Sequence, residues 1–132
     1  MNTIKHILES GIYCFWLCFL LHLLADYTLQ GCLADLKQLT WWHNRVYPTA
    51  WRKYRHDYKA GLACHALMWS LMTFLPLMLV LSPERFSVTV LLNAGIHLAI
   101  DDLKTNKKAL NLCEDQIAHF LQIVVTILII YR

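Results

Sequence analysis

The chain has 132 residues, 58% of them hydrophobic, and a formal net charge of +3. Soluble domains use about 45–50% apolar residues, so the composition argues against a soluble protein and indicates one membrane domain over residues 1–132. The small net charge becomes informative only when its lysines and arginines are placed on the topology. Apolar stretches near the roughly 20 residues that cross a bilayer predict an all-α, polytopic bundle of four transmembrane helices, at about 12–29, 62–81, 86–102 and 116–131.

The first predicted span follows Lys5 and therefore competes with a secretory signal peptide. No small-x-small cleavage site follows the apolar run, so we expect the segment to be retained. Cys14 and Cys18 lie within this span, and we expect both to pack in the core as small hydrophobic residues. The five cysteines of the chain are odd in number and form no C-x-x-C pair, which argues against a disulfide framework and a thiolate zinc site.

The connection between the first two spans is long, basic and aromatic. Its basic residues are Lys37, Arg45, Arg52, Lys53, Arg55 and Lys59, and its aromatic residues are Trp41, Trp42, Tyr47, Trp51, Tyr54 and Tyr58. Such a mixture is typical of a membrane interface beside anionic headgroups. We therefore expect an interfacial amphipathic segment, divided by Pro48, that contacts membrane lipids. Because the loop is tethered at the bilayer, nucleic acid is not an expected partner.

The second and third spans are separated by the short segment SPERF at 82–86, which suits an exposed turn between two antiparallel helices. The third span reaches full length only if its helix continues through Asp101 and Asp102. That extension predicts a buried acid near the end of the helix.

The connection between the third and fourth spans carries Lys104, Lys107 and Lys108, whereas the turn at 82–86 offers only Arg85. Loops rich in lysine and arginine remain cytoplasmic. Both basic connections are therefore predicted on the cytoplasmic side, with both termini outside, in the inner membrane of a bacterium.

Three of the four spans contain a His and an Asp four residues apart, namely His22 with Asp26, His97 with Asp101, and Asp115 with His119. Residues four apart on a helix share one face and are separated by about 6 Å along the axis. The reversed order in the fourth span places every Asp nearer the cytoplasmic surface and every His deeper. His65 of the second span falls at a similar depth, so the sequence predicts that four histidines and three aspartates converge.

Imidazole and carboxylate groups that project from facing helices form zinc, iron and manganese sites. We therefore predict a divalent metal site, with zinc favoured over iron or manganese, whose ligands are His22, Asp26, His65, His97, Asp101 and His119. The alternative is a metal-free hydrogen-bonded network that fixes helix register. The number of these groups favours the metal, because each ionisable side chain inside a membrane costs roughly 2.5–3.5 kcal/mol. The remaining histidines, His6, His43 and His56, are expected in solvent.

The chain resembles a family of small bacterial and phage membrane proteins known as domain of unknown function 3307. The family pattern is a His-x-x-x-Asp followed by Leu-Gln, an Ala-x-x-Lys, a His that opens the second span, a His-x-x-x-Asp-x-x-Lys and an Asp-Gln-x-x-His. These positions are His22, Asp26, Leu29, Gln30, Ala34, Lys37, His65, His97, Asp101, Lys104, Asp115, Gln116 and His119. The additional Asp102 and a longer aromatic loop depart from the pattern. The resemblance implies that the constellation acts as a unit, and a looser similarity to membrane-bound metal-dependent hydrolases implies hydrolytic chemistry.

We accordingly expect a membrane-embedded, metal-dependent hydrolase that acts on a lipid or another amphiphile from the cytoplasmic leaflet. Asp115 would act as a ligand or base, Lys104 and Lys37 would hold an anionic headgroup, and Gln30 and Gln116 would orient the ligands. No G-x-S-x-G motif indicates a serine hydrolase.

Two other functions remain open from the sequence. The cluster could handle ions or protons, although the outer half of the bundle offers few polar groups for a pathway. Alternatively, the chain could be a non-catalytic phage or plasmid membrane factor that engages a partner through its basic loop. A second copy of the chain is a further candidate partner.

Overall fold

The computed structural model describes residues 10–46 and 49–132, and its regular secondary structure over these residues is helical. The elements are α2 (Gly11–Leu24), the π-helical segment η1 (Ala25–Leu29), α3 (Leu33–Leu36), α4 (Leu39–Arg45), α5 (Trp51–Tyr54), α6 (Asp57–Thr73), the 3-10 segment η2 (Leu75–Leu79), α7 (Pro83–Thr105) and α8 (Leu112–Ile130). The all-α prediction is thus confirmed. Lys5, His6, Tyr47 and Pro48 lie outside the described residues, as do the expectations that concern them.

Three helices are long and apolar enough to cross a membrane: α2 with η1 (Gly11–Leu29), α7 and α8. The predicted second span, 62–81, is divided between α6 and η2. Helix α6 has 17 residues and ends at Thr73. Pro76 lies in the first turn of η2, where its missing N–H cannot continue the α-helical hydrogen bonds. The described residues therefore show three candidate spans, where the sequence predicted four.

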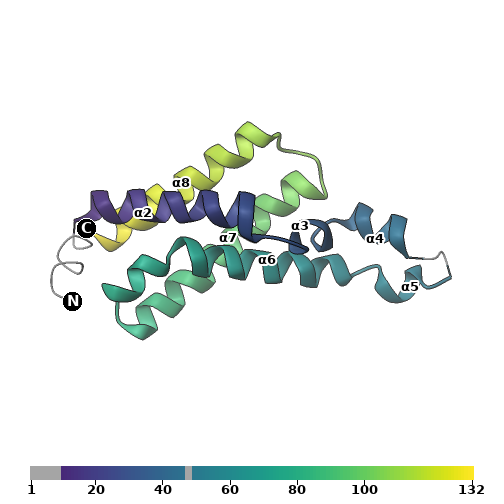
Figure 1. The fold of residues 1–132 in the computed structure, drawn as a ribbon, viewed down its shortest axis with the longest axis horizontal. Coiled ribbons are helices and arrows are strands. Elements are labelled where there is room, and N and C mark those ends of the chain that lie inside the picture. Colours follow the sequence, from purple (N-terminus) through teal and green to yellow (C-terminus); the bar gives the residue numbers. More distant parts are fainter. Residues whose placement is uncertain (1–9, 47–48) are drawn as a thin grey trace.

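The long helices form a bundle in which α2 lies beside α8 and α6 lies beside α7 (Figure 1). The α6–α7 pair is antiparallel, as the segment at 82–86 predicted. Helices α4 and α5 lie at one end of the bundle, next to the beginning of α6, and the connection between α7 and α8 lies at that end too. The C-terminus and the turn between η2 and α7 lie at the opposite end. Both basic connections are therefore on the same end of the bundle.

The beginnings of α7 and α8 are fixed by capping residues. Ser82 precedes α7, its hydroxyl accepts the backbone N–H of Arg85, and Pro83 occupies the first turn, a position where its missing N–H costs nothing. Asn111 and Glu114 form a reciprocal capping box at the start of α8. These caps set where each helix begins and therefore at which level its His/Asp pair lies.

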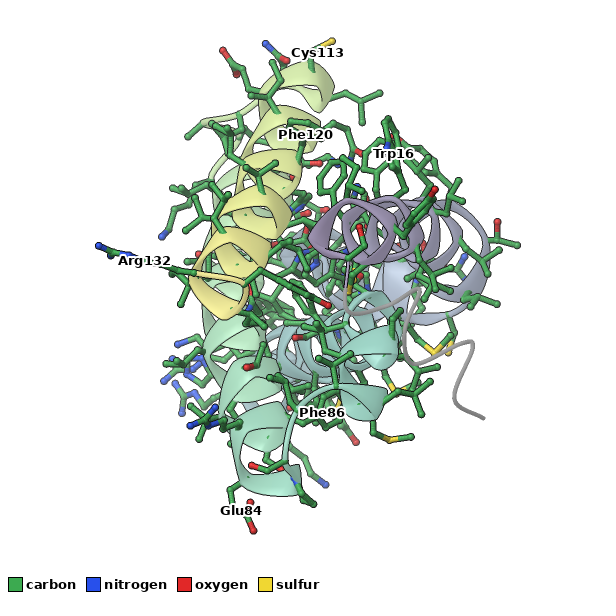
Figure 2. The ribbon with its side chains drawn as sticks, turned by 90° about the vertical axis from the view of Figure 1, so that its left-hand side faces the viewer. Trp16, Glu84, Phe86, Cys113, Phe120 and Arg132 are labelled. Carbon is green, nitrogen blue, oxygen red and sulfur yellow. The ribbon has the colours of Figure 1, made fainter. Side chains whose placement is uncertain are left out.

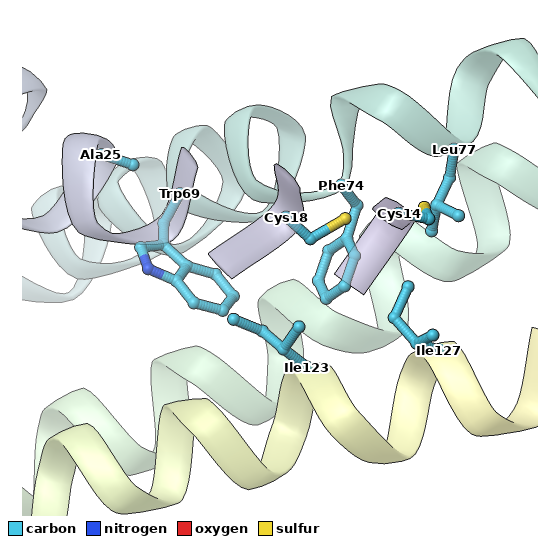
Figure 3. Packing of buried hydrophobic residues seen from close by; sticks show 8 residues of the cluster. All are labelled: Cys14, Cys18, Ala25, Trp69, Phe74, Leu77, Ile123 and Ile127. Carbon is cyan, nitrogen blue, oxygen red and sulfur yellow. The ribbon is translucent and has the colours of Figure 1, made fainter. Parts of the chain in front are cut away.

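The apolar core occupies the end of the bundle that contains the C-terminus. Figure 3 shows its side chains, contributed by α2, η1, α6, α8 and the segment around η2. They are Cys14, Cys18, Ala25, Trp69, Phe74, Leu77, Ile123 and Ile127. The prediction that Cys14 and Cys18 are buried is confirmed. On the outside of the bundle, Leu91 and Ile129 are 65% and 71% exposed, as expected where lipid covers the helices.

The short helix α3 packs against α6 and brings the following residue, Lys37, into the bundle. A Cβ atom at Gly61 of α6 would overlap the carbonyl group of Leu36, so the close approach requires glycine. Asn106, directly after α7, donates to the backbone carbonyl of Lys37 at 3.2 Å and accepts the backbone N–H of Leu39 at 2.8 Å. The start of the basic connection is therefore attached to the end of α7.

Candidate metal centre

The structure brings the predicted histidines and aspartates together next to the apolar core, which they contact through Trp69. Each helix contributes buried side chains from one face, because residues four apart on a helix point the same way. The buried set consists of His22, Asp26, His65, His97, Asp101, Asp115 and His119. In contrast, His43 and His56 are exposed, as predicted.

Three overlapping groups of these side chains could hold a metal ion, since the ligand atoms within each group lie within 4.8 Å of one another. The groups are Asp26 with His65 and His97, His97 with Asp101 and His119, and Asp26 with Asp115 and His119. Every predicted metal ligand except His22 belongs to at least one group. Asp115, for which the sequence suggested a role as ligand or base, belongs to the third.

His22 lies beside these groups and is held by two hydrogen bonds. Its Nδ1 atom accepts the indole N–H of Trp69 at 3.0 Å. An indole N–H can only donate, so the neutral ring carries its proton on Nε2. That N–H faces Oε1 of Gln116 at 3.3 Å. The amide group of Gln116 in turn donates to Oδ2 of Asp26 at 2.9 Å and to Oδ2 of Asp115 at 3.1 Å. Both nitrogens of His22 are thus engaged, and Nε2 is connected to the two carboxylates through Gln116.

Three imidazole rings form a chain through the middle of the cluster. Nδ1 of His97 lies 3.2 Å from Nδ1 of His119, and Nε2 of His97 lies 3.2 Å from Nε2 of His65. The indole of Trp69 stacks on His97 at 3.9 Å between ring centroids, with 13° between the planes. Trp69 was not predicted as a site residue, although it lies four residues after His65 and therefore on the same helix face.

Two lysines neutralise part of the carboxylate charge. Lys37 donates to Oδ2 of Asp101 at 2.7 Å and lies 3.1 Å from Nε2 of His65. Lys104 donates to Oδ2 of Asp115 at 2.5 Å. Because Lys37 is buried, the structure places it inside the cluster, whereas the sequence assigned it to a headgroup. Two ammonium groups face three carboxylates, which leaves one negative charge for another cation.

Oδ1 of Asp115 and Nε2 of His119, two buried atoms of the third group, make no hydrogen bond of normal geometry and face each other as an i, i+4 ion pair. They lie 3.3 Å apart. A zinc or manganese ion at about 2.1 Å from two ligand atoms holds them roughly 3.0–3.4 Å apart, depending on whether the angle is octahedral or tetrahedral. The separation therefore fits two neighbouring ligands of one cation, and unsatisfied buried groups are otherwise costly.

Comparisons of the chain with family models, curated proteins and solved structures found no match. The arrangement of the side chains therefore carries the functional information. Buried His and Asp groups that could hold a metal ion are present, and their donor set does not by itself indicate which metal.

Proposed function

We propose that this chain is a membrane-embedded, metal-dependent hydrolase whose single cation is held by Asp26, Asp115 and His119. The observation that carries the proposal is the pair of buried atoms on Asp115 and His119 that face each other at 3.3 Å without a hydrogen bond of normal geometry. A divalent cation between them would satisfy both atoms and would offset the remaining negative charge. Zinc, iron and manganese all accept two carboxylates and one imidazole.

One arrangement of protons leaves this group free to bind a cation. A neutral imidazole has one nitrogen with a proton and one without, and one proton must lie between the Nδ1 atoms of His97 and His119. If His119 carries it, Nε2 of His119 is free to bind a cation. Nε2 of His97 then carries a proton and faces His65. In this arrangement His97 accepts the hydrogen bond from Nδ1 of His119, and neither His97 nor His65 binds the ion. A metal-bound histidine commonly donates its other ring N–H to a neighbouring group in this way.

The cation would lower the pKa of a bound water and polarise the scissile group. Gln116 and Lys104 hold the carboxylate of Asp115 through Oδ2, which keeps Oδ1 directed toward His119. Lys104 also supplies positive charge for an anionic substrate. In the overall reaction the oxygen of water bonds to the scissile carbon or phosphorus, the bond to the leaving oxygen breaks, and that oxygen takes up a proton from water.

The membrane arrangement belongs to the same proposal. Helix α6 with η2 would supply the fourth span, and both basic connections would lie on the cytoplasmic side of a bacterial inner membrane, with both termini outside. The resemblance of its motifs to domain of unknown function 3307, which is part of this proposal, would make the His/Asp cluster one functional unit. The aromatic and basic segment around α4 and α5 would contact the lipid headgroups.

Elemental analysis by mass spectrometry of detergent-purified protein tests the metal site. We expect about one zinc, iron or manganese ion per chain in the wild type. Asp115→Asn and His119→Gln should lose it. Asp102→Asn is the matched control, because Asp102 adjoins the cluster but pairs with Lys107 at 3.0 Å. Folded wild-type protein that remains empty after incubation with all three metals would exclude this function.

Hydrolysis is tested separately with metal-loaded protein in liposomes. Phosphatidylglycerol is the first substrate, because it is an anionic lipid, and its products are quantified by mass spectrometry. Turnover should require the metal and disappear in Asp115→Asn. A loaded protein that turns over neither phosphatidylglycerol nor other anionic amphiphiles would leave a metal-binding protein without hydrolase activity.

Proton handling is a second candidate function, which the chain of His65, His97 and His119 favours. Its nitrogen-to-nitrogen separations of 3.2 Å suit proton transfer between rings. Proton flux into liposomes that carry wild-type protein, and that stops in His97→Ala, would support this function over hydrolysis.

A further inference from the structure

We infer that the substrate is an anionic bilayer lipid that reaches the cluster sideways, with one acyl chain between α2 and α8 and its headgroup in a basic pocket at the end of the bundle. This inference rests on the proposed function and names its substrate class. It follows from an apolar groove lined by Gln116 and a basic pocket lined by Lys104, two residues that both donate to Asp115.

The apolar groove lies between α2 with η1 on one side and α8 on the other. Phe19, Leu23, Tyr27, Gln116, Ile117 and Phe120 line a volume of about 350 Å³. A second apolar cavity of about 750 Å³ begins at the other side of Phe120 and continues to the end of α8. Figure 2 shows Phe120 and Trp16, from α8 and α2, on the same side of the bundle. Since both helices are candidate membrane spans, lipid chains are the surrounding solvent of this groove.

Gln116 connects the groove to the cluster. Its side chain is half-buried and is the polar group at the inner end of the groove. It donates to Asp26 and Asp115, two of the three proposed ligands. The polar end of a lipid whose chain fills the groove would therefore lie at the proposed cation.

The basic pocket is connected to Asp115 through Lys104. Lys37, Lys104 and Lys108 line it together with Gln30, Gln38 and other residues, and its volume is about 300 Å³. Lys104 donates to Oδ2 of Asp115 at 2.5 Å, and Gln116 donates to the same oxygen at 3.1 Å. One residue of the pocket and one of the groove thus meet on one carboxylate oxygen. Lys37 and Lys104 are paired with Asp101 and Asp115, so Lys108 is the residue of the pocket that suits an anionic headgroup, and an acyl chain suits the groove.

The dimensions agree with this occupant. Sixteen residues separate Gln116 from Arg132, at the far end of the second cavity, which corresponds to about 24 Å at 1.5 Å per residue. One leaflet contributes roughly half of the 30 Å hydrocarbon core, or about 15 Å. The groove and the second cavity together therefore match the length of an acyl chain, with Phe120, which packs against Phe15 and Phe19, between them. A small soluble anion would fill only the basic pocket and would leave the groove without a role.

Photo-crosslinking of lipids to metal-free protein tests this inference. Wild-type protein is reconstituted with phosphatidylcholine and a phosphatidylglycerol that carries a diazirine in mid-chain, and adducts are located by mass spectrometry. We expect adducts on Leu23, Ile117 and Phe120. Leu23→Trp or Ile117→Trp should fill the groove and reduce the yield there at least fivefold. Leu91→Trp is the matched control, because Leu91 is 65% exposed on α7 and lies outside the groove.

The headgroup is tested with the same lipids. Lys108→Gln should reduce the preference for phosphatidylglycerol over a phosphatidylcholine probe by about fivefold, the usual effect of one basic side chain beside an anionic surface. Adducts spread equally over the groove and the Leu91 face, or an unchanged yield in both filled variants, would overturn the inference and indicate surrounding lipid only. Crosslinks between two protein chains in the groove would indicate a second copy there. If adducts are confined to the groove in a protein that never binds metal, the proposed hydrolase function is refuted and the lipid site is retained.

Discussion

Replacing Lys37 with methionine removes the cation that faces Asp101 and keeps most of the apolar stem. The two groups are 2.7 Å apart, and their side chains are 10% and 1% exposed. Removing one partner of a buried ion pair typically lowers the free energy of unfolding by about 3–5 kcal/mol, because the other charge stays buried. His65 lies 3.1 Å from the same carboxylate oxygen and remains as a partner of Asp101. We therefore expect the free energy of unfolding to fall by about 3 kcal/mol, at the lower end of this range.

The measurement is unfolding of purified protein in mixed detergent with a chelator present. Lys37→Met with Asp101→Asn should recover most of the loss, since both charges are then absent. Lys107→Met is the matched control: its partner Asp102 is 3.0 Å away, but the pair is 62% and 21% exposed, so its loss should cost less than about 1 kcal/mol. If Lys37→Met is no more destabilising than Lys107→Met, or if the double variant is additive, Asp101 does not depend on Lys37.

Three further predictions concern stability and are measured by thermal unfolding of detergent-purified variants. Gly61→Ala should be strongly destabilising, because its Cβ would overlap α3, whereas Gly95→Ala meets nothing within 4 Å and should stabilise by about 0.5–1 kcal/mol; equal effects would contradict the close packing of α3 on α6. Trp69→Phe keeps an aromatic ring over the cluster but loses the 3.0 Å hydrogen bond to His22. This loss should cost about 1 kcal/mol of stability, and an unchanged midpoint of thermal unfolding would refute the hydrogen bond. Asn111→Ala should cost about 1 kcal/mol through loss of the cap of α8, and Asn111→Asp should retain most of it.

The sequence predicted the long elements well, because apolar runs of bilayer length have few alternatives. It placed three candidate spans close to where the structure has them. It did not predict the break after Thr73, although Pro76 was a visible signal. The short helices α3, α4 and α5 could not be read from periodicity, since elements of four to seven residues contain too few turns to show it.

The candidate site was predictable as a set of residues but not as a set of partners. The i, i+4 spacing correctly places His97 with Asp101 at 3.7 Å and Asp115 with His119 at 3.3 Å. For His22 and Asp26 the connection runs through Gln116 instead. One reason is local: Asp26 lies in the π-helical segment η1, whose wider turns shift residues away from α-helical register.

Lys37 shows why the rest could not be predicted. Its burial depends on the hydrogen bonds between Asn106 and the chain at Lys37 and Leu39, which join segments nearly seventy positions apart. No local pattern encodes such a contact. Likewise, the facing atoms of Asp115 and His119, without a hydrogen bond of normal geometry, become visible only when every neighbouring donor and acceptor is known.

The position of the three carboxylates bears on how such a protein enters a bilayer. Asp26 lies in η1 at the end of the first helix, Asp101 in the last turns of α7, and Asp115 in the first turn of α8. An isolated helix can therefore insert its apolar length while its own acid stays among the headgroups, and it avoids most of the roughly 2.5–3.5 kcal/mol that a charge costs at the bilayer centre. The carboxylates would become buried in the bundle only when the helices associate and the lysines pair with them. Assembly of the polar cluster would then be a late step of biogenesis, completed after all the hydrophobic segments are in place.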